Sequence, residues 1–349
     1  MGNDVYIVTT NVMLNLDGNR TIVEPKEYLN SDGVKIIRLN THRKINRSRG
    51  NYKTLYLTLV DIKPDFIMDH GFCIVSSIGI SMYKEKYPNC RVIADSHATN
   101  DNMDYSYRAA IYLMILRMIS NRYYNMCEKI YGITSETLDI LDKVYNVPKS
   151  KIELLPLGYD QRLISDDCEY WEKKLGNKEL RHKYVFVNGG KLDKRKKTLE
   201  LARAIRNKGD VFLIIFGTFV SKEYEELVKK NAGDNVQFVG ALTSKKIYSL
   251  YSYADVAIFP GSPSCLRQEA VSSGLPIIMC CNDGDQDINI IENDNGIILN
   301  KNWSEIELKE AIQAMIDRID YYRENAKILA NGDYSRYSYS SQAKYLLGI

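Results

Sequence analysis

Short apolar runs rich in β-forming residues alternate with segments of helical periodicity along most of the chain. The runs that predict strands are 5–10, 34–39, 66–69, 91–95, 129–134 and 152–155 in the first half, then 184–187, 211–216, 236–239, 256–259, 277–281 and 296–299. The periodicity predicts helices near 51–62, 77–86, 105–123, 135–145, 198–207, 221–231, 244–253, 265–273 and 303–330. Strands that alternate with helices predict parallel sheets covered on both faces.

Two such arrays follow one another, which predicts an α/β protein of two doubly wound, Rossmann-like domains facing a cleft. A length of 349 residues suits two domains better than one. The predicted linker is residues 156–160, where Pro156 and Gly158 interrupt the pattern directly after a strand. The expected domains are therefore 1–157 and 158–333.

Composition narrows the class of protein. Charged residues make up 26% of the chain and the net charge is +3, too small a charge to make nucleic acid the expected partner. The seven cysteines show no CxxC pair, which is typical of reduced thiols in a cytoplasmic protein. The start shows no signal peptide, and the longest apolar helical segment, 111–119, is too short to span a bilayer.

The window 254–279 carries the most informative pattern. It reads as an apolar strand, a sharp loop over 260–264, a short helix stopped by Gly274, and a second apolar strand. Free N–H groups at the start of such a helix attract phosphate, and Glu269, about one turn in, offers a carboxylate to sugar hydroxyls. An ordinary strand–helix unit without a ligand is the alternative interpretation.

The residues of this window, ADVAIFPGSPSCLRQEAVSSGLPIIM, resemble the nucleotide-sugar site of the family 4, group 1 glycosyltransferases, the retaining GT-B enzymes. The segment KIELLPLGYD also resembles the place where that family's chain crosses between domains. The resemblance implies sugar transfer from a UDP- or GDP-linked donor to a glycan or lipid-linked acceptor, with no cofactor and no metal. It also implies that a C-terminal helix over 334–349 packs back on the first domain.

A second motif opens the second domain, at 188–197. Gly189 and Gly190 predict a turn close to a ligand, and Lys191 and Lys196 follow it. In the family the corresponding pair contacts the donor diphosphate, and fixed cations lower the free energy of the charge that develops on a departing diphosphate. A solvated basic turn is the alternative.

Further positions match the family less specifically. Gly217 and Gly240 follow strands where the family's backbone approaches base and ribose. The family's first glutamate is absent, because Gly261 stands eight positions before Glu269. The hydroxyls of Ser262 and Ser264, with backbone amides, are expected to hold sugar and phosphates instead, and the acidic loop 283–287 offers further sugar contacts or is a polar turn.

In the first domain, His97 ends a strand and resembles the family's histidine near the donor sugar. A turn histidine is the alternative. Asp69, His70 and Gly71 end another strand and are taken first as a capped turn. The basic segment 41–53 suits an anionic acceptor or membrane surface, or is a solvated loop, and helix 105–123 is expected to be a core helix rather than an interfacial one.

The start of the chain departs from the family. No glycine-rich loop and long helix precede the strands at 5–10 and 34–39, which resemble the family's second and third strands, and 11–32 reads as a loop. We therefore expect a first domain without its first βα unit, its apolar sheet covered by 11–32, a partner subunit, a second copy or the membrane.

The sequence thus favours a retaining glycosyltransferase with Lys191 and Lys196 on the diphosphate, Glu269 on the ribose and His97 near the sugar. Fold alone does not separate this from an epimerase or a non-catalytic nucleotide-sugar-binding subunit. The expected location is the cytoplasm, with peripheral contact at the inner face of the membrane.

Overall fold

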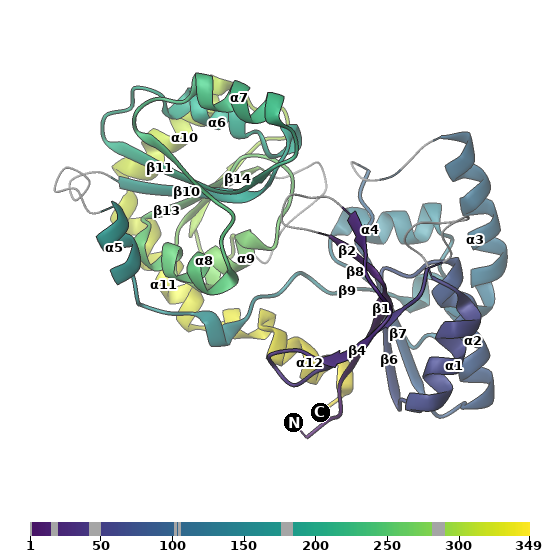
Figure 1. Cartoon of the computed structure of the whole chain (residues 1–349). Coiled ribbons are helices and arrows are strands. Elements are labelled where there is room, and N and C mark those ends of the chain that lie inside the picture. The colour runs from purple at the N-terminus through teal and green to yellow at the C-terminus, as the bar shows by residue number, and fades with distance from the viewer. Residues whose placement is uncertain are drawn as a thin grey trace. The chain divides into compact units, whose positions relative to one another are not determined.

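The structure is a computed structural model, and it describes residues 2–14, 20–41, 50–100, 103, 106–175, 184–280 and 290–349. The chain divides into two compact units, Met1–Leu155 and Pro156–Ile349, hereafter unit 1 and unit 2. Each unit is an α/β body with a parallel sheet, as the alternating pattern predicts (Figure 1). None of the helices in the described ranges is both long and apolar enough to cross a membrane.

Unit 2 is built on a six-stranded parallel sheet of order β12-β11-β10-β13-β14-β15. Its strands are β10 (Tyr184–Leu192), β11 (Val211–Phe219), β12 (Val236–Gly240), β13 (Val256–Phe259), β14 (Ile277–Cys280) and β15 (Gly296–Leu299). Its α-helices are α5 (Glu169–Leu175), α6 (Thr198–Ile205), α7 (Lys222–Asn231), α8 (Ser244–Tyr253), α9 (Leu266–Ser272), α10 (Glu305–Asp317), α11 (Ile319–Asn331) and α12 (Tyr339–Leu347). All six strands predicted for this half are present.

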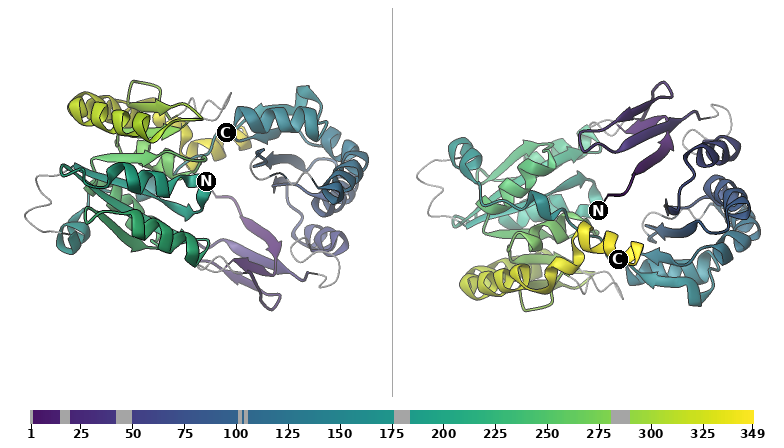
Figure 2. Two further views of the ribbon diagram at one scale, coloured as in Figure 1. Left: turned by 90° about the horizontal axis from the view of Figure 1, so that it is seen from above. Right: turned by 90° about the horizontal axis from the view of Figure 1, so that it is seen from below.

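Helices cover both faces of this sheet, with α6, α7 and α10 on one side and α8 and α9 on the other (Figure 1; Figure 2 gives two further views). The central strands therefore bury both of their faces, as in β13, where all four residues are buried. The two large apolar cores of the described part of unit 2 result, one containing Val187 and Ile214 and the other Phe186 and Leu213. Successive residues of a strand point to opposite faces, so β10 and β11 each supply both cores.

The turn predicted at Gly189 and Gly190 is wrong, because β10 continues through both glycines to Leu192 and pairs with β11 along its whole length. A Cβ at Gly189 would lie 2.6 Å from the ring of Phe216, and one at Gly217 would lie 1.9 Å from the carbonyl oxygen of Gly190. The glycines are therefore needed for close packing of the two strands.

The predicted helix 303–330 is two helices, α10 and α11, separated at Arg318. Arg318 leaves the helical region with φ −126° and ψ 29°, and its guanidinium lies 4.3 Å from the ring centroid of Tyr321. Helix α5 was not predicted. Helix α12 contacts the 3-10 segment η6 (Asp333–Tyr337), and Gln342 donates a 2.6 Å hydrogen bond to the carbonyl of Pro156.

The described strands of unit 1 lie in three separate sheets. A three-stranded sheet has the order β1-β5-β4, a four-stranded parallel sheet the order β6-β7-β8-β9, and β2 and β3 form a hairpin. The strands are β1 (Tyr6–Thr10), β2 (Val12–Leu14), β3 (Arg20–Ile22), β4 (Glu27–Leu29), β5 (Lys35–Leu39), β6 (Phe66–His70), β7 (Arg91–Ser96), β8 (Ile130–Gly132) and β9 (Ile152–Leu154). The helices are α1 (Tyr52–Ile62), α2 (Ile74–Lys86), α3 (Tyr107–Met126) and α4 (Ser135–Asp139), which continues as a π-helical turn over Ile140–Val144.

The predicted loop 11–32 contains three short strands in its described part, β2, β3 and β4. No helix lies between β1 and β5 in the described part of that segment, so the chain here shows no βα unit of the usual kind, as expected. These three strands were not predicted because each is three residues long and too short to show a period of two.

The expectation that helix 105–123 is a core helix is wrong for one of its faces. Helix α3 buries Leu116, Tyr123 and Tyr124 in unit 1. Another set of its apolar side chains is exposed, namely Tyr107, Ile111, Met114, Ile115, Met118 and Ile119. Most of these recur at a spacing of three or four residues and so form a stripe along the helix.

Candidate functional site

The loop that follows β13 packs against the segment that follows β10. The Ser262 N–H donates a 2.9 Å hydrogen bond to the carbonyl of Arg195. The Lys196 ammonium donates in return to the carbonyls of Ser262 and Pro263, at 3.0 and 2.7 Å. The structure therefore brings together the two motifs that the sequence separates by more than 60 residues.

Gly261 is the tightest point of this contact. A Cβ at position 261 would lie 2.2 Å from the carbonyl oxygen of Arg195 and 2.4 Å from the carbonyl carbon of Lys196. The obstructing atoms are backbone, so no rotamer change relieves the clash. A glutamate at 261 is therefore incompatible with this backbone, and the loop is built for glycine.

Lys196 is largely enclosed. Burial, together with the positive charge of Arg267, lowers the pKa of its ammonium from 10.5 to about 8. The ammonium is consequently still charged at neutral pH but held at a disadvantage. An anion beside it would stabilise the charged form.

Arg267 is a site residue that the sequence analysis missed. It is fully buried on α9, and its guanidinium donates to the carbonyls of Phe259, Gly261 and Cys280. These oxygens lie at the ends of β13 and β14 and in the loop, so the guanidinium fixes the loop from beneath. A basic residue inside a short apolar helix was the available signal.

Glu269 lies two residues further along α9. Burial raises the pKa of its carboxyl from 4.5 to about 7. Its Oε2 atom is buried and makes no hydrogen bond within the described structure. Buried acceptors without a partner are rare in folded proteins and call for a donor.

Three other residues of unit 2 were predicted to belong to the site, namely Ser264, Lys191 and Gly240. Ser264 lies close to the site, because a Cβ added to Gly190 would lie 4.0 Å from its Oγ. Lys191 extends from β10 as an exposed side chain opposite Thr218. Gly240 ends β12 with a φ of +75°, two strands away from β10 in the sheet, so it belongs to the same edge but not to this cluster.

The start of α9 offers less to a phosphate than the sequence indicates. The helix has seven residues. The Leu266 N–H already bonds the Ser264 hydroxyl at 3.4 Å, and the Arg267 N–H bonds the Ser264 carbonyl at 3.1 Å. The positive charge at this site comes from Lys196 rather than from a free helix N-terminus.

Unit 1 holds a second polar cluster at the carboxyl ends of β6 and β7. The Nδ1 of His70 lies 2.8 Å from Asp95 Oδ2, the Nε2 of His97 lies 3.4 Å from the same oxygen, and the Gly71 N–H donates to Oδ1 at 2.7 Å. Burial alone would raise the pKa of Asp95, but the hydrogen bonds with His70 and His97 hold it well below its usual value. The hydrogen bond to Asp95 raises the pKa of His70.

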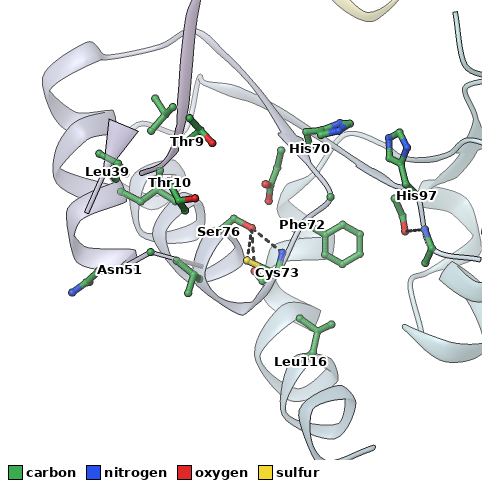
Figure 3. Close-up of a pocket in the computed structure, with 18 of the residues that line it drawn as sticks. Thr9, Thr10, Leu39, Asn51, His70, Phe72, Cys73, Ser76, His97 and Leu116 are labelled. Carbon is green, nitrogen blue, oxygen red and sulfur yellow. Dashed lines mark hydrogen bonds between the residues drawn. The ribbon is translucent and has the colours of Figure 1, made fainter. Parts of the chain in front are cut away.

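His70 is therefore more than the capped turn favoured from sequence, because it shares a carboxylate with His97. Their rings meet edge to face with centroids 4.6 Å apart. Both line a cavity of about 530 Å³ within unit 1, with Thr9, Thr10, Asn51 and Ser76 also on its wall (Figure 3). The cavity presents hydroxyl, amide and imidazole groups together, a lining suited to a polar ligand.

Within the described ranges, His70, Asp95 and His97 are also the group whose geometry could hold a metal ion, with ligand atoms within 4.8 Å of one another. The Nδ1 of His70 and the Nε2 of His97, however, already have the Asp95 carboxylate as a hydrogen-bond partner. The acidic loop 283–287 and most of the basic segment 41–53 lie outside the described residues.

Comparison with known protein families gives a match within unit 2. Residues 169–328 match the family model described as "Glycosyl transferases group 1". This match runs from the start of α5 into α11 and therefore includes Lys196, Gly261 and Glu269. No curated protein sequence matches the chain.

Solved structures resemble the whole chain. Sucrose-phosphate synthase (tll1590) from Thermosynechococcus elongatus is 19% identical and has a TM-score of 0.71, covering 99% of this chain and 88% of its own. A glycosyltransferase from Rickettsia africae ESF-5 is 15% identical with a TM-score of 0.67, over 90% of this chain and 84% of its own. Anabaena Alr3699/HepE in complex with UDP-glucose is 16% identical with a TM-score of 0.64, over 90% of this chain and 86% of its own. The chain therefore has the GT-B fold of two Rossmann-like units, and its second unit carries the group 1 glycosyl transferase match.

Proposed function

We propose that this protein is a retaining glycosyltransferase that moves a sugar from a nucleotide-sugar donor to a hydroxyl of a glycan or lipid-linked acceptor. The observation that carries the proposal is Glu269, a buried carboxylate with an unused acceptor atom in the segment that matches group 1 glycosyl transferases. A ribose supplies vicinal hydroxyl donors of the kind that Oε2 lacks. The structurally similar HepE is described in complex with UDP-glucose, which supports a nucleotide sugar as donor.

Lys196 is the proposed diphosphate contact. Its ammonium is anchored to the Ser262 and Pro263 carbonyls and has a depressed pKa, so an incoming diphosphate relieves an unfavourable buried charge. The charge that develops on the leaving diphosphate strengthens this contact as the sugar departs. Lys191, exposed and close in sequence, is the proposed second cation.

The absent glutamate changes the expected sugar contacts. Because Gly261 admits no side chain, the backbone amides and hydroxyls around Ser262 and Ser264 are the proposed replacements. In unit 1, His97 and His70 are proposed to bind hydroxyl or phosphate oxygens of a substrate through their ring nitrogens. Asp95 keeps both rings oriented.

Transfer is proposed to proceed without a metal ion, because Lys191 and Lys196 supply positive charge where the diphosphate would bind. The diphosphate oxygen itself is the proposed acceptor of the proton from the attacking hydroxyl, so no separate general base is assigned. The bond between the sugar and the diphosphate breaks, and the acceptor oxygen forms the new bond to the sugar. The nucleoside diphosphate then leaves with the proton of the acceptor hydroxyl.

A lipid-linked acceptor and peripheral membrane contact are supported by α3. Its exposed stripe of Tyr107, Ile111, Met114 and Met118 would bury apolar surface at a membrane interface. The test is co-sedimentation with vesicles of phosphatidylglycerol and phosphatidylcholine. Met114→Glu with Met118→Glu should abolish binding, whereas Glu substitutions on exposed Leu227 of α7 should leave it intact.

The direct test of the function is donor turnover. The protein is incubated with UDP- and GDP-sugars, and release of the nucleoside diphosphate is followed with and without simple glycoside acceptors. Acceptor-dependent release supports a transferase. Epimer formation without acceptor would favour an epimerase, and tight binding without turnover would favour a non-catalytic binding subunit.

A further inference from the structure

Two strand edges in unit 1 flank the same cavity. Strand β1 has β5 as its sheet neighbour, and β6 has β7, so in the described ranges each presents one edge without a strand beside it. The cavity of about 530 Å³ is lined by Val8, Thr9 and Thr10 of β1 and by Asp69 and His70 of β6 (Figure 3). The carboxyl ends of both strands thus meet at one place, as in neighbouring strands of a parallel sheet.

The backbone groups on these edges point away from the existing partners. The Lys35 N–H bonds the Val5 carbonyl, and the Asn11 N–H bonds the Leu39 carbonyl, so the odd-numbered residues of β1 face β5. Because backbone groups of a strand alternate between its two sides, Tyr6 and Val8 direct theirs to the opposite edge.

The same reasoning applies to β6. The Arg91 N–H bonds the Asp65 carbonyl, which places the odd-numbered residues of this strand on the β7 side. Phe66 and Met68 therefore direct their N–H and C=O groups toward the open edge.

The edge of β1 lacks the features that normally protect an exposed strand. The outer strand of the same sheet, β4, is three residues long and is preceded by Pro25 and Lys26, which discourage further pairing. Strand β1 is YIVTT, with no charge and no proline. Its Ile7 side chain is 45% exposed, and Met68 of β6 is 40% exposed.

Unit 2 shows what a completed sheet of this chain looks like. There β10 lies between β11 and β13, and its residues from Val185 to Gly189 are all buried. By comparison, no residue of β1 is buried. Among the described residues, β1 therefore has one neighbouring strand where β10 has two.

We propose that the space between β1 and β6 accepts a parallel β-strand from a polypeptide other than a copy of this chain. The inserted strand would join β4-β5-β1 to β6-β7-β8-β9 in one continuous sheet. A central parallel strand is buried on both faces and donates on both sides, so the occupant is an uncharged run rich in Val, Ile or Phe without proline. Backbone pairing of this kind is a common mode of peptide recognition.

The test is hydrogen exchange resolved to single amides on the whole 349-residue protein. The probe is a synthetic peptide with the uncharged sequence YVFVNGG and blocked termini, a copy of residues 184–190, which belong to a central parallel strand in unit 2. Binding should slow exchange at the amides of Tyr6, Val8 and Met68 by about tenfold or more and leave the odd-numbered amides of β1 unchanged. A peptide with proline at its second and fourth positions should have no effect.

Variants of the chain provide the second arm. Val8→Pro removes a donor that β5 does not use and should abolish the protection, while Val8→Ala should retain it. If the peptide at saturating concentration leaves these amides unprotected in the wild type and in Val8→Ala, the proposal is wrong. Protection that rises with protein concentration in the absence of peptide would also overturn it, because the edges would then pair with a second copy of this chain.

Discussion

Gly261 and Lys196 touch through their backbones: a Cβ on Gly261 would lie 2.4 Å from the carbonyl carbon of Lys196. The same lysine reaches over the loop with its ammonium and bonds the carbonyl of Pro263 at 2.7 Å. The glycine at position 261, where the sequence resemblance led us to expect a glutamate, and the close packing of the loop on Lys196 are therefore one structural feature, since the packing leaves no room for a side chain.

Restoring a side chain at position 261 should consequently damage the site. We expect Gly261→Ala to destabilise the protein by roughly 1–3 kcal/mol, the usual range for overpacking, and to weaken donor binding. Gly209→Ala is the matched control, because a Cβ there meets nothing within 4 Å. Urea unfolding of both variants checks the prediction, and equal midpoints would show that the loop yields easily.

Binding of UDP should have a narrow pH optimum. The ribose needs Glu269 ionised, and the pKa of this carboxyl is about 7, so affinity should rise as pH increases through 7. The diphosphate needs Lys196 charged, and its pKa is about 8, so affinity should fall as pH increases through 8. Calorimetry between pH 5.5 and pH 9.5 measures both limbs.

Two variants separate those limbs. Glu269→Gln should flatten the acid limb, because it stays neutral throughout, and Lys196→Arg should flatten the alkaline limb, because arginine keeps its proton. A pH profile of the same shape in wild type and both variants would remove these two residues from the donor site.

The stability of Glu269→Gln should depend on pH in a stated direction. Folding raises the pKa of Glu269 from 4.5 to about 7, so the unfolded chain binds fewer protons between these values and wild-type stability falls as pH rises through this range. The neutral glutamine escapes that loss. The variant should match wild type near pH 4 and exceed its free energy of unfolding at pH 8 by about 3 kcal/mol. A variant less stable than wild type at pH 8 would contradict the buried carboxylate.

Removal of metal ions should leave transfer intact. The cations proposed to stabilise the diphosphate are lysines, so dialysis against EDTA should change turnover by less than about twofold. Restoration of a lost activity by one divalent cation would instead indicate that His70, Asp95 and His97 hold a metal ion. His70→Gln should then remove the dependence on the cation if these three residues hold the ion, and should leave it unchanged if the ion binds elsewhere.

Much of the fold follows from hydrophobic pattern because the central strands are buried on both faces. All twelve predicted strands are present, but β2, β3 and β4 were missed, since three-residue strands carry no measurable period. The continuation of β10 through Gly189 depends on a neighbour in space, the ring of Phe216 on the next strand. Such a contact is not visible in a local window of sequence.

The site was partly predictable for a similar reason. Lys196 and Glu269 stand in recognisable motifs, and the structure places the first against the 260–264 loop and the second in the helix that follows it. Arg267 escaped notice because its role depends on carbonyls of two strands and a loop. His70 was underrated because its partner, Asp95, lies on the neighbouring strand.

The central claim is that Lys196 binds the diphosphate of a nucleotide donor. Calorimetric titration of UDP into wild type, Lys196→Ala and Lys194→Ala at pH 7.5 tests it most directly, because Lys194 is an exposed lysine in the same turn. We predict that Lys196→Ala weakens binding by roughly 1–3 kcal/mol, the contribution of a hydrogen bond to a charged group, while Lys194→Ala binds as wild type. Equal affinity in folded Lys196→Ala and wild type would contradict the account.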